Sequence, residues 1–163
     1  MSIPIWFLDV DGVVNAAGVD LPPHLIRTEA TTQGTTWPIH YSPEVVDFIN
    51  MVHRAGLAEV RWLTTWGQDA RSSLAPAVGL DDFFAYDMYD SDGWWKAEVV
   101  AASIKIDGRL VVWTDDEITE HAIGGLLDPV PAPPLLVSPL TTTGLVSEDL
   151  RRILEFVAAA SRR

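Results

Sequence analysis

Short runs of apolar residues alternate with amphipathic segments along the chain. A short apolar run bounded by turn residues is typical of a buried strand. The predicted strands occupy 3–8, 59–64, 83–86, 109–114 and 135–137. The intervening and following segments predict helices over 42–55, 68–77, 94–104, 118–123 and from Ser147 onward. Strands that alternate with helices predict an α/β fold, a Rossmann-like three-layer sandwich around a central parallel sheet.

Residues 15–41 interrupt this alternation because they carry no helical period. Segments 25–32 and 35–41 are joined by Gln33-Gly34, which predicts a β-hairpin. We therefore expect a small hairpin flap on an otherwise regular α/β domain.

Composition favours one domain. The chain of 163 residues is 48% hydrophobic, which suits a single core within residues 1–163. The proline-rich segment 128–134 is therefore predicted as an extended connection. The absence of cysteine excludes disulfides, thiolate metal sites and a cysteine nucleophile. No apolar run is long enough for a membrane span, and the start lacks a basic leader, so we expect a cytoplasmic protein.

The charge balance limits the partners. The formal net charge is −12, and only 11 residues are Lys or Arg. Proteins that bind the phosphate backbone over an extended surface use many basic side chains. We therefore expect no extended nucleic-acid surface, and any contact with a nucleic acid to be local.

Two pairs of aspartates each follow an apolar run. Asp9 and Asp11 follow the first predicted strand, and Asp115 and Asp116 follow the fourth. The carboxyl ends of parallel strands meet at one edge of the sheet, where ligands bind in such folds. Two carboxylates about 4 Å apart repel by about 4 kcal/mol at an effective dielectric constant of about 20, so this arrangement requires a cation. Oxygen ligands alone favour Mg²⁺ over Zn²⁺.

Two other structures produce similar patterns. A calcium-binding EF-hand loop has glycine at its sixth position and glutamate at its twelfth, whereas the segment that begins at Asp9 has Gly12 fourth and Asp20 twelfth. Acidic residues also begin many helices, because they interact favourably with the positive end of the helix dipole. That alternative applies to Asp115 and Asp116 taken alone, and the acidic pair after the first strand argues against it.

The sequence FLDVDGVVN at 7–15 resembles the first motif of the haloacid dehalogenase superfamily of aspartate-nucleophile phosphatases. Three further matches follow in the order expected for that superfamily. WLTT at 62–65 is similar to the strand-end Ser/Thr motif, Lys96 to the lysine motif, and VVWTDD at 111–116 to the acidic motif. The resemblance implies a Rossmann-like domain in which segment 15–41 is a flap instead of a full cap domain.

A narrower resemblance spans nearly the whole chain. WLTTW at 62–66, WWK at 94–96 and WTDDE at 113–117 resemble the small phosphatase-like domain of the bacterial multi-enzyme RNA repair proteins known as Swiss Army Knife proteins. This resemblance again implies an aspartate-dependent phosphatase.

The resemblance implies roles for individual side chains. Asp9 would be the nucleophile that attacks the phosphoryl group and forms an aspartyl phosphate. Asp11 would protonate the leaving oxygen and later activate water against that intermediate. Thr64 and Lys96 would stabilise charge on the transferring oxygens, with Thr65 as the alternative to Thr64.

A Mg²⁺ cofactor is implied as well. Its expected ligands are a carboxylate oxygen of Asp9, the main-chain carbonyl of Asp11, and Asp116 or Asp115, with water and the phosphate completing the coordination. We expect Asp116 to be the direct ligand and Asp115 to lie behind it, although the sequence leaves this choice open.

Six of the seven tryptophans divide into two groups. Trp6, Trp62 and Trp113 lie within predicted strands and are expected in the core. Three others lie near strand ends or in loops, where they can stack a nucleobase: Trp66, Trp94 and Trp95. Packing inside the domain is the alternative for this trio.

The sequence thus predicts a Mg²⁺-dependent phosphatase, a hydrolase of phosphoric monoesters. A small flap leaves the site open to bulky substrates, whereas a small metabolite usually needs a lid that excludes water. A nucleotide or nucleic-acid end is therefore the expected substrate, and a small phosphorylated metabolite is the alternative. A phosphate-binding module without turnover is a further alternative, which the complete set of candidate residues argues against.

Overall fold

The computed structural model describes residues 2–128, 130 and 132–162. Its centre is a sheet of five parallel strands in the order β5-β4-β1-β6-β7. The strands are β1 (Ile5–Leu8), β4 (Glu59–Trp62), β5 (Phe84–Ala85), β6 (Val111–Thr114) and β7 (Leu135–Val137). The predicted α/β architecture is confirmed, and most strands are shorter than predicted. Residues 129 and 131 of the predicted proline-rich connection lie outside the described residues.

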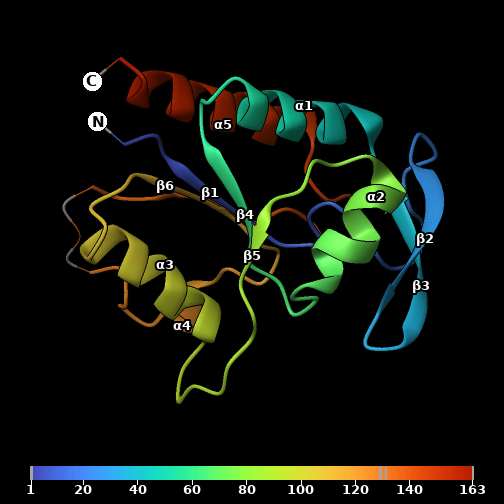
Figure 1. Cartoon of the computed structure of the whole chain (residues 1–163), viewed down its shortest axis with the longest axis horizontal. Helices are drawn as coiled ribbons and strands as arrows, with labels where there is room; N and C mark the ends of the chain where they lie inside the picture. The colour runs from blue at the N-terminus through green and yellow to red at the C-terminus, as the bar shows by residue number, and fades with distance from the viewer. Residues whose placement is uncertain (1, 129, 131, 163) are drawn as a thin grey trace.

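Helices cover both faces of this sheet, as Figure 1 shows. Helices α1 (Pro43–Arg54) and α5 (Ser147–Ala160) pack together on one face, whereas α3 (Trp95–Lys105) and α4 (Glu120–Ile123) lie on the other. The predicted three-layer sandwich is confirmed. Within the part of the chain that the structure describes, no helix combines the length and apolar character needed to cross a bilayer.

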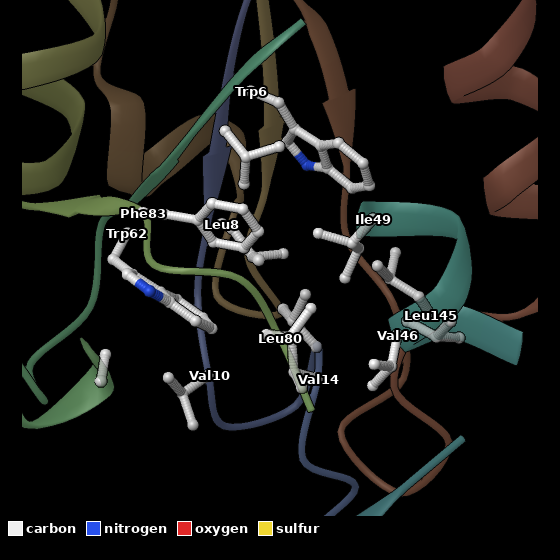
Figure 2. Close-up of a cluster of buried hydrophobic side chains, with 14 of the residues drawn as sticks. Trp6, Leu8, Val10, Val14, Val46, Ile49, Trp62, Leu80, Phe83 and Leu145 are labelled. Atoms are coloured by element: carbon white, nitrogen blue, oxygen red, sulfur yellow. The ribbon is translucent and has the colours of Figure 1, made fainter. Parts of the chain in front are cut away.

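Strand β1 is buried on both faces, and its side chains alternate between two apolar clusters. Trp6 and Leu8 pack against the layer that contains α1 and α5, and Ile5 and Phe7 pack against the layer that contains α3. Figure 2 shows part of the first cluster, in which Trp6 and Leu8 point toward the same interior space as Ile49 of α1. Burying each such side chain contributes about 1.5–3 kcal/mol, so the strand that ends at Asp9 is firmly held.

The segment between β4 and β5 differs from its prediction as a regular helix over 68–77. A π-helix, η1 (Ala70–Leu74), leads into the short helix α2 (Ala75–Val78). Pro76 has no N–H, and its ring would crowd a carbonyl in the preceding turn of an α-helix. The N–H of Ala75 donates to the carbonyl of Ala70 in the wider π pattern.

The predicted hairpin is confirmed as the antiparallel strands β2 (Ile26–Thr32) and β3 (Thr35–Tyr41). Its loop residues Gln33 and Gly34 have φ angles of +50° and +76°, as a type I′ turn requires. Asp69 Oδ2 accepts a hydrogen bond from the N–H of Gln33 at 3.0 Å. The hairpin is thereby attached to the segment that follows β4, beside α2 in Figure 1.

Candidate functional site

The carboxyl ends of β1, β4 and β6 lie side by side because Leu8 is in register with Trp62 and Thr114. Asp9 directly follows β1, and Asp115 directly follows β6. The N–H of Asp9 also donates to the carbonyl of Thr114 at 3.1 Å. The chain extends the sheet from β1 to β4 and β5 on one side and then to β6 and β7 on the other. Ligands of open α/β sheets bind beyond the strand ends at such a change of direction.

Lys96 connects two of the predicted aspartates inside the protein. Its Nζ lies 3.1 Å from Asp9 Oδ2 and 2.6 Å from Asp115 Oδ2. The exposed fractions of Asp9, Lys96 and Asp115 are 6%, 3% and 0%. The second carboxylate oxygens accept main-chain hydrogen bonds, from Val10 to Asp9 at 2.8 Å and from Glu117 to Asp115 at 2.9 Å. Each buried charge therefore has the partners that a low-dielectric environment demands.

This buried cluster holds two carboxylates and one ammonium group. Burial raises the pKa of Asp9 to about 8, and the Asp115 charge adds to the increase while Lys96 opposes it. Burial alone would lower the pKa of Lys96, but the Asp9 and Asp115 carboxylates outweigh burial and raise it. Lys96 therefore stays protonated, and the ionisation of Asp9 leaves a surplus negative charge that a further cation would balance.

Three aspartates can hold that cation. Carboxylate oxygens of Asp9, Asp115 and Asp116 all lie within 4.8 Å of one another, and an oxygen-only donor set fits Mg²⁺. Asp115 already accepts a bond on each oxygen, from Lys96 and from a main-chain N–H. Asp116 has one oxygen bonded by the Thr141 hydroxyl at 2.6 Å. Within this pair Asp116 is therefore the less engaged carboxylate and the better suited to direct ligation, whereas Asp115 contacts Lys96.

Gly12 gives Asp116 the space to approach Asp9. A Cβ at Gly12 would lie 2.1 Å from Asp116 Oδ2, far inside van der Waals contact. The φ angle of Gly12 is +74°, a region that glycine occupies without strain. The glycine that follows Asp11 thus permits both the turn after β1 and the approach of Asp116 to Asp9.

Asp11 lies apart from the buried cluster. Its Oδ2 accepts a hydrogen bond from Trp66 Nε1 and its Oδ1 accepts one from Asn15 Nδ2, both at 2.9 Å. Asn15 in turn accepts a bond from the N–H of His40 in β3 at 2.8 Å. Asn15 was not predicted as a site residue, although it is the polar end of the segment 7–15. Asn15 fixes the Asp11 carboxylate relative to the hairpin.

Thr64 and Thr65 have opposite surroundings after β4. Thr64 is 1% exposed, and its Oγ1 accepts a hydrogen bond from the N–H of Trp66 at 3.2 Å. That bond leaves the hydroxyl proton of Thr64 free to donate from a fixed position. Thr65 is exposed and lines a cavity beside Asp11.

The three tryptophans predicted to stack a nucleobase are largely buried, which favours the packing alternative. Trp66 and Trp95 are only 5% and 7% exposed, and they belong to the apolar clusters on opposite faces of the sheet. Trp94 is half-buried and packs on Trp113, with ring centroids 5.0 Å apart. The three do not form one surface, because Trp66 and Trp95 lie on opposite faces of the sheet and Trp94 packs on Trp113. The strand tryptophans are fully buried, as predicted: Trp6, Trp62 and Trp113.

A cavity of about 430 Å³ separates the hairpin from the strand ends. Asp11 and Asn15 line it from the loop after β1, and Thr65 and Trp66 line it from the loop after β4. The hairpin contributes Trp37, which is 51% exposed. Of the predicted catalytic residues, Asp11 is thus the one that faces this cavity.

No protein-family model matches the chain, and no curated protein matches it either. The function must therefore be inferred from the residues of the site and their geometry.

Proposed function

We propose that the protein is a Mg²⁺-dependent phosphatase of the haloacid dehalogenase type, which hydrolyses phosphoric monoesters through an aspartyl phosphate on Asp9. One observation carries the proposal. Two aspartates two residues apart have opposite surroundings, since Asp9 is buried against Lys96 and Asp115, whereas Asp11 faces an open cavity. Such a separation suits a nucleophile and an acid-base group, which need different environments.

Asp9 is proposed to attack the phosphorus atom. The Val10 N–H and the Lys96 ammonium hold the two oxygens of Asp9 in place, so the carboxylate is oriented before the substrate binds. The new bond joins an Asp9 oxygen to phosphorus while the bond from phosphorus to the leaving oxygen breaks. Lys96 and the Thr64 hydroxyl are proposed to stabilise the charge on the non-bridging oxygens.

Asp11 is proposed to give a proton to the leaving oxygen and then to take one from water that attacks the aspartyl phosphate. A general acid must lie within hydrogen-bond reach of the atom that it protonates. Trp66 and Asn15 hold Asp11 at the wall of the cavity. We therefore expect the leaving group to lie in the cavity, next to Asp11.

Asp9 and Asp116 are the proposed Mg²⁺ ligands, together with the main-chain carbonyl of Asp11. The oxygen-only donor set, the space at Gly12 and the surplus negative charge all fit a divalent cation. When bound, Mg²⁺ would offset the charge of the phosphate and keep Asp9 ionised at neutral pH.

Hydrolysis of acetyl phosphate and p-nitrophenyl phosphate tests the proposal directly. Wild-type protein is expected to release phosphate when Mg²⁺ is present and to lose that activity with EDTA. Asp128→Asn provides a matched control, because it removes an exposed aspartate from the surface. Binding of phosphate without any turnover by the wild type would identify a phosphate-binding module instead and would overturn the proposal.

A further inference from the structure

The cavity beneath the hairpin lies on the leaving-group side of the site. Asp11 lines this cavity, whereas the buried side chains Asp9, Lys96 and Asp115 do not. A phosphoryl group at Asp9 whose leaving oxygen contacts Asp11 therefore directs the rest of the substrate into the cavity. Its volume of about 430 Å³ lies within the range of about 300–1,000 Å³ that small-ligand sites occupy.

The lining of the cavity selects against charged leaving groups. Asp11 is the charged side chain of the lining, and neither Lys nor Arg contributes to it among the described residues. A second phosphate in the cavity would lose water from its charge, with no Lys or Arg of the described lining to balance it. The polar lining groups are otherwise neutral, and they include the hydroxyls of Thr32, Thr35 and Thr65 and the amide of Gln33. These groups can donate to and accept from sugar hydroxyls and the edges of a base.

Trp37 supplies a flat surface at the hairpin wall. Its side chain extends from β3, opposite Ala30 of β2 in the hairpin, and it is 51% exposed although it lines the cavity. A large aromatic ring that stays open to solvent beside a cavity can stack against a flat ligand. The buried indole of Trp66 lines the cavity as well, but it is engaged by Asp11 through its N–H.

We propose, on the basis of the phosphatase function above, that this cavity binds the nucleoside portion of a mononucleotide, with its base stacked on Trp37. The neutral hydrogen-bonding lining matches a nucleoside, and the absence of a cation from the lining, among the residues that the structure describes, disfavours the phosphates of a polynucleotide. Trp37 is therefore a specificity-determining residue that sequence analysis did not select, since its position in a polar hairpin carries no signal of a site.

Kinetics with two substrates provide the first test. Trp37→Ala is expected to lower kcat/KM for AMP by about 5- to 150-fold, the loss that corresponds to one base stack of about 1–3 kcal/mol. The same variant is expected to hydrolyse acetyl phosphate within about twofold of wild type, because that substrate has no ring to stack. Trp37→Phe should restore most of the AMP activity. Equal losses on both substrates, or none on AMP, would overturn the assignment of Trp37.

Binding without turnover separates this proposal from the phosphatase function. Isothermal titration of wild-type protein with adenosine is expected to show binding that Trp37→Ala weakens by a similar factor. Phe84→Ala is the matched control, since Phe84 is a 55% exposed aromatic residue on β5 outside the cavity lining. It should leave adenosine binding unchanged. If adenosine binds in a manner that depends on Trp37 but the protein has no phosphatase activity, the cavity proposal is supported and the phosphatase proposal is not. If the protein hydrolyses acetyl phosphate but does not bind adenosine, the cavity proposal is overturned and the phosphatase proposal stands.

Comparison with a phosphorylated oligonucleotide tests whether the substrate is a mononucleotide or the end of a nucleic acid. The proposal predicts that AMP is hydrolysed with a higher kcat/KM than a 3′- or 5′-phosphorylated decanucleotide. The reverse preference would show that the cavity admits a polynucleotide end, and it would contradict the assignment to mononucleotides.

Discussion

Asp9 and Asp11 are two residues apart in the chain, yet they occupy two different kinds of environment. Asp9 lies in a buried cluster with Lys96 and Asp115, where burial raises its pKa to about 8. Asp11 faces an open cavity and accepts hydrogen bonds from two neutral side chains, Trp66 and Asn15. The turn after β1 therefore separates two carboxylates of the same type, and their surroundings determine which chemistry each can perform.

Replacing each of the two aspartates by asparagine gives the largest expected contrast. Asp9→Asn should reduce turnover of every substrate to below about a thousandth of the wild-type rate, because an amide cannot act as the nucleophile. Asp11→Asn should reduce hydrolysis of alkyl phosphates by about 100- to 10,000-fold, but it should still transfer the phosphoryl group from acetyl phosphate to Asp9, because a good leaving group needs little protonation. Steady-state kinetics with alkyl phosphates and acid-quenched phosphorylation by acetyl phosphate measure this difference. Failure of both variants to become phosphorylated would remove the distinction between the two regions.

Removal of Lys96 is expected to have the next largest effect, on stability. Lys96→Met leaves Asp9 and Asp115 buried without their cation, and breaking a buried ion pair from one side costs about 3–5 kcal/mol. Lys105→Met, at the exposed end of the same helix, is the matched control and should change stability by less than about 1 kcal/mol. Urea unfolding of both variants without Mg²⁺ measures the difference. Equal stability of the two variants would show that the buried cluster does not depend on Lys96.

Two glycines test the space for the metal. Gly12 and Gly79 both have positive φ angles, but a Cβ at Gly12 would meet Asp116, whereas a Cβ at Gly79 would meet no atom of the described residues within 4 Å. Both alanine variants are expected to lose about 1 kcal/mol from backbone strain. Gly12→Ala alone should also lose the rise in melting temperature that Mg²⁺ gives the wild type. A full Mg²⁺ response in Gly12→Ala would separate Asp116 from the metal site.

A further comparison concerns the pH dependence of stability. Asp9 has a folded-state pKa of about 8 and an unfolded value near 3.9, so between these values the metal-free folded state holds a proton that the unfolded state has lost. The contribution of Asp9 to the free energy of unfolding is therefore largest below about pH 4, and it declines as the pH rises toward 8. Subtracting the pH profile of Asp9→Asn from that of the wild type isolates this decline. We expect the free energy of unfolding of the wild type to fall with rising pH relative to Asp9→Asn, and Mg²⁺ to suppress this fall. A difference between the two proteins that does not change with pH would contradict the assignment.

The fold could be predicted from the sequence because its signals are local. The apolar runs that became β1 and β6 are buried on both faces, and the dipeptide Gln33-Gly34 has the two positive φ angles of a tight hairpin turn. The π-helix before Pro76 was not predicted, because a helical period carries no information about which carbonyl each N–H meets.

The candidate site was predicted less completely than the fold. The positions of Asp9 and Asp115 follow from the register of parallel strands, which brings their ends to one edge. The contacts of Trp66 with Asp11, and of Asn15 with both Asp11 and the hairpin, join segments far apart in the chain. Such contacts depend on how the hairpin packs, and residue type and spacing do not encode that packing. Trp37 was missed for the same reason.

Detection of a phosphorylated enzyme tests the central claim most directly. Asp11→Asn protein mixed with acetyl phosphate and Mg²⁺, then quenched in acid, should carry one phosphoryl group that hydroxylamine removes, because the intermediate forms on Asp9 and its hydrolysis lacks the residue that activates water. Peptide mass spectrometry should place the group on Asp9, and Asp9→Asn should show none. Phosphorylation at another residue, or hydrolysis by the wild type with no phosphorylated intermediate in either protein, would contradict the assignment of Asp9 as the nucleophile.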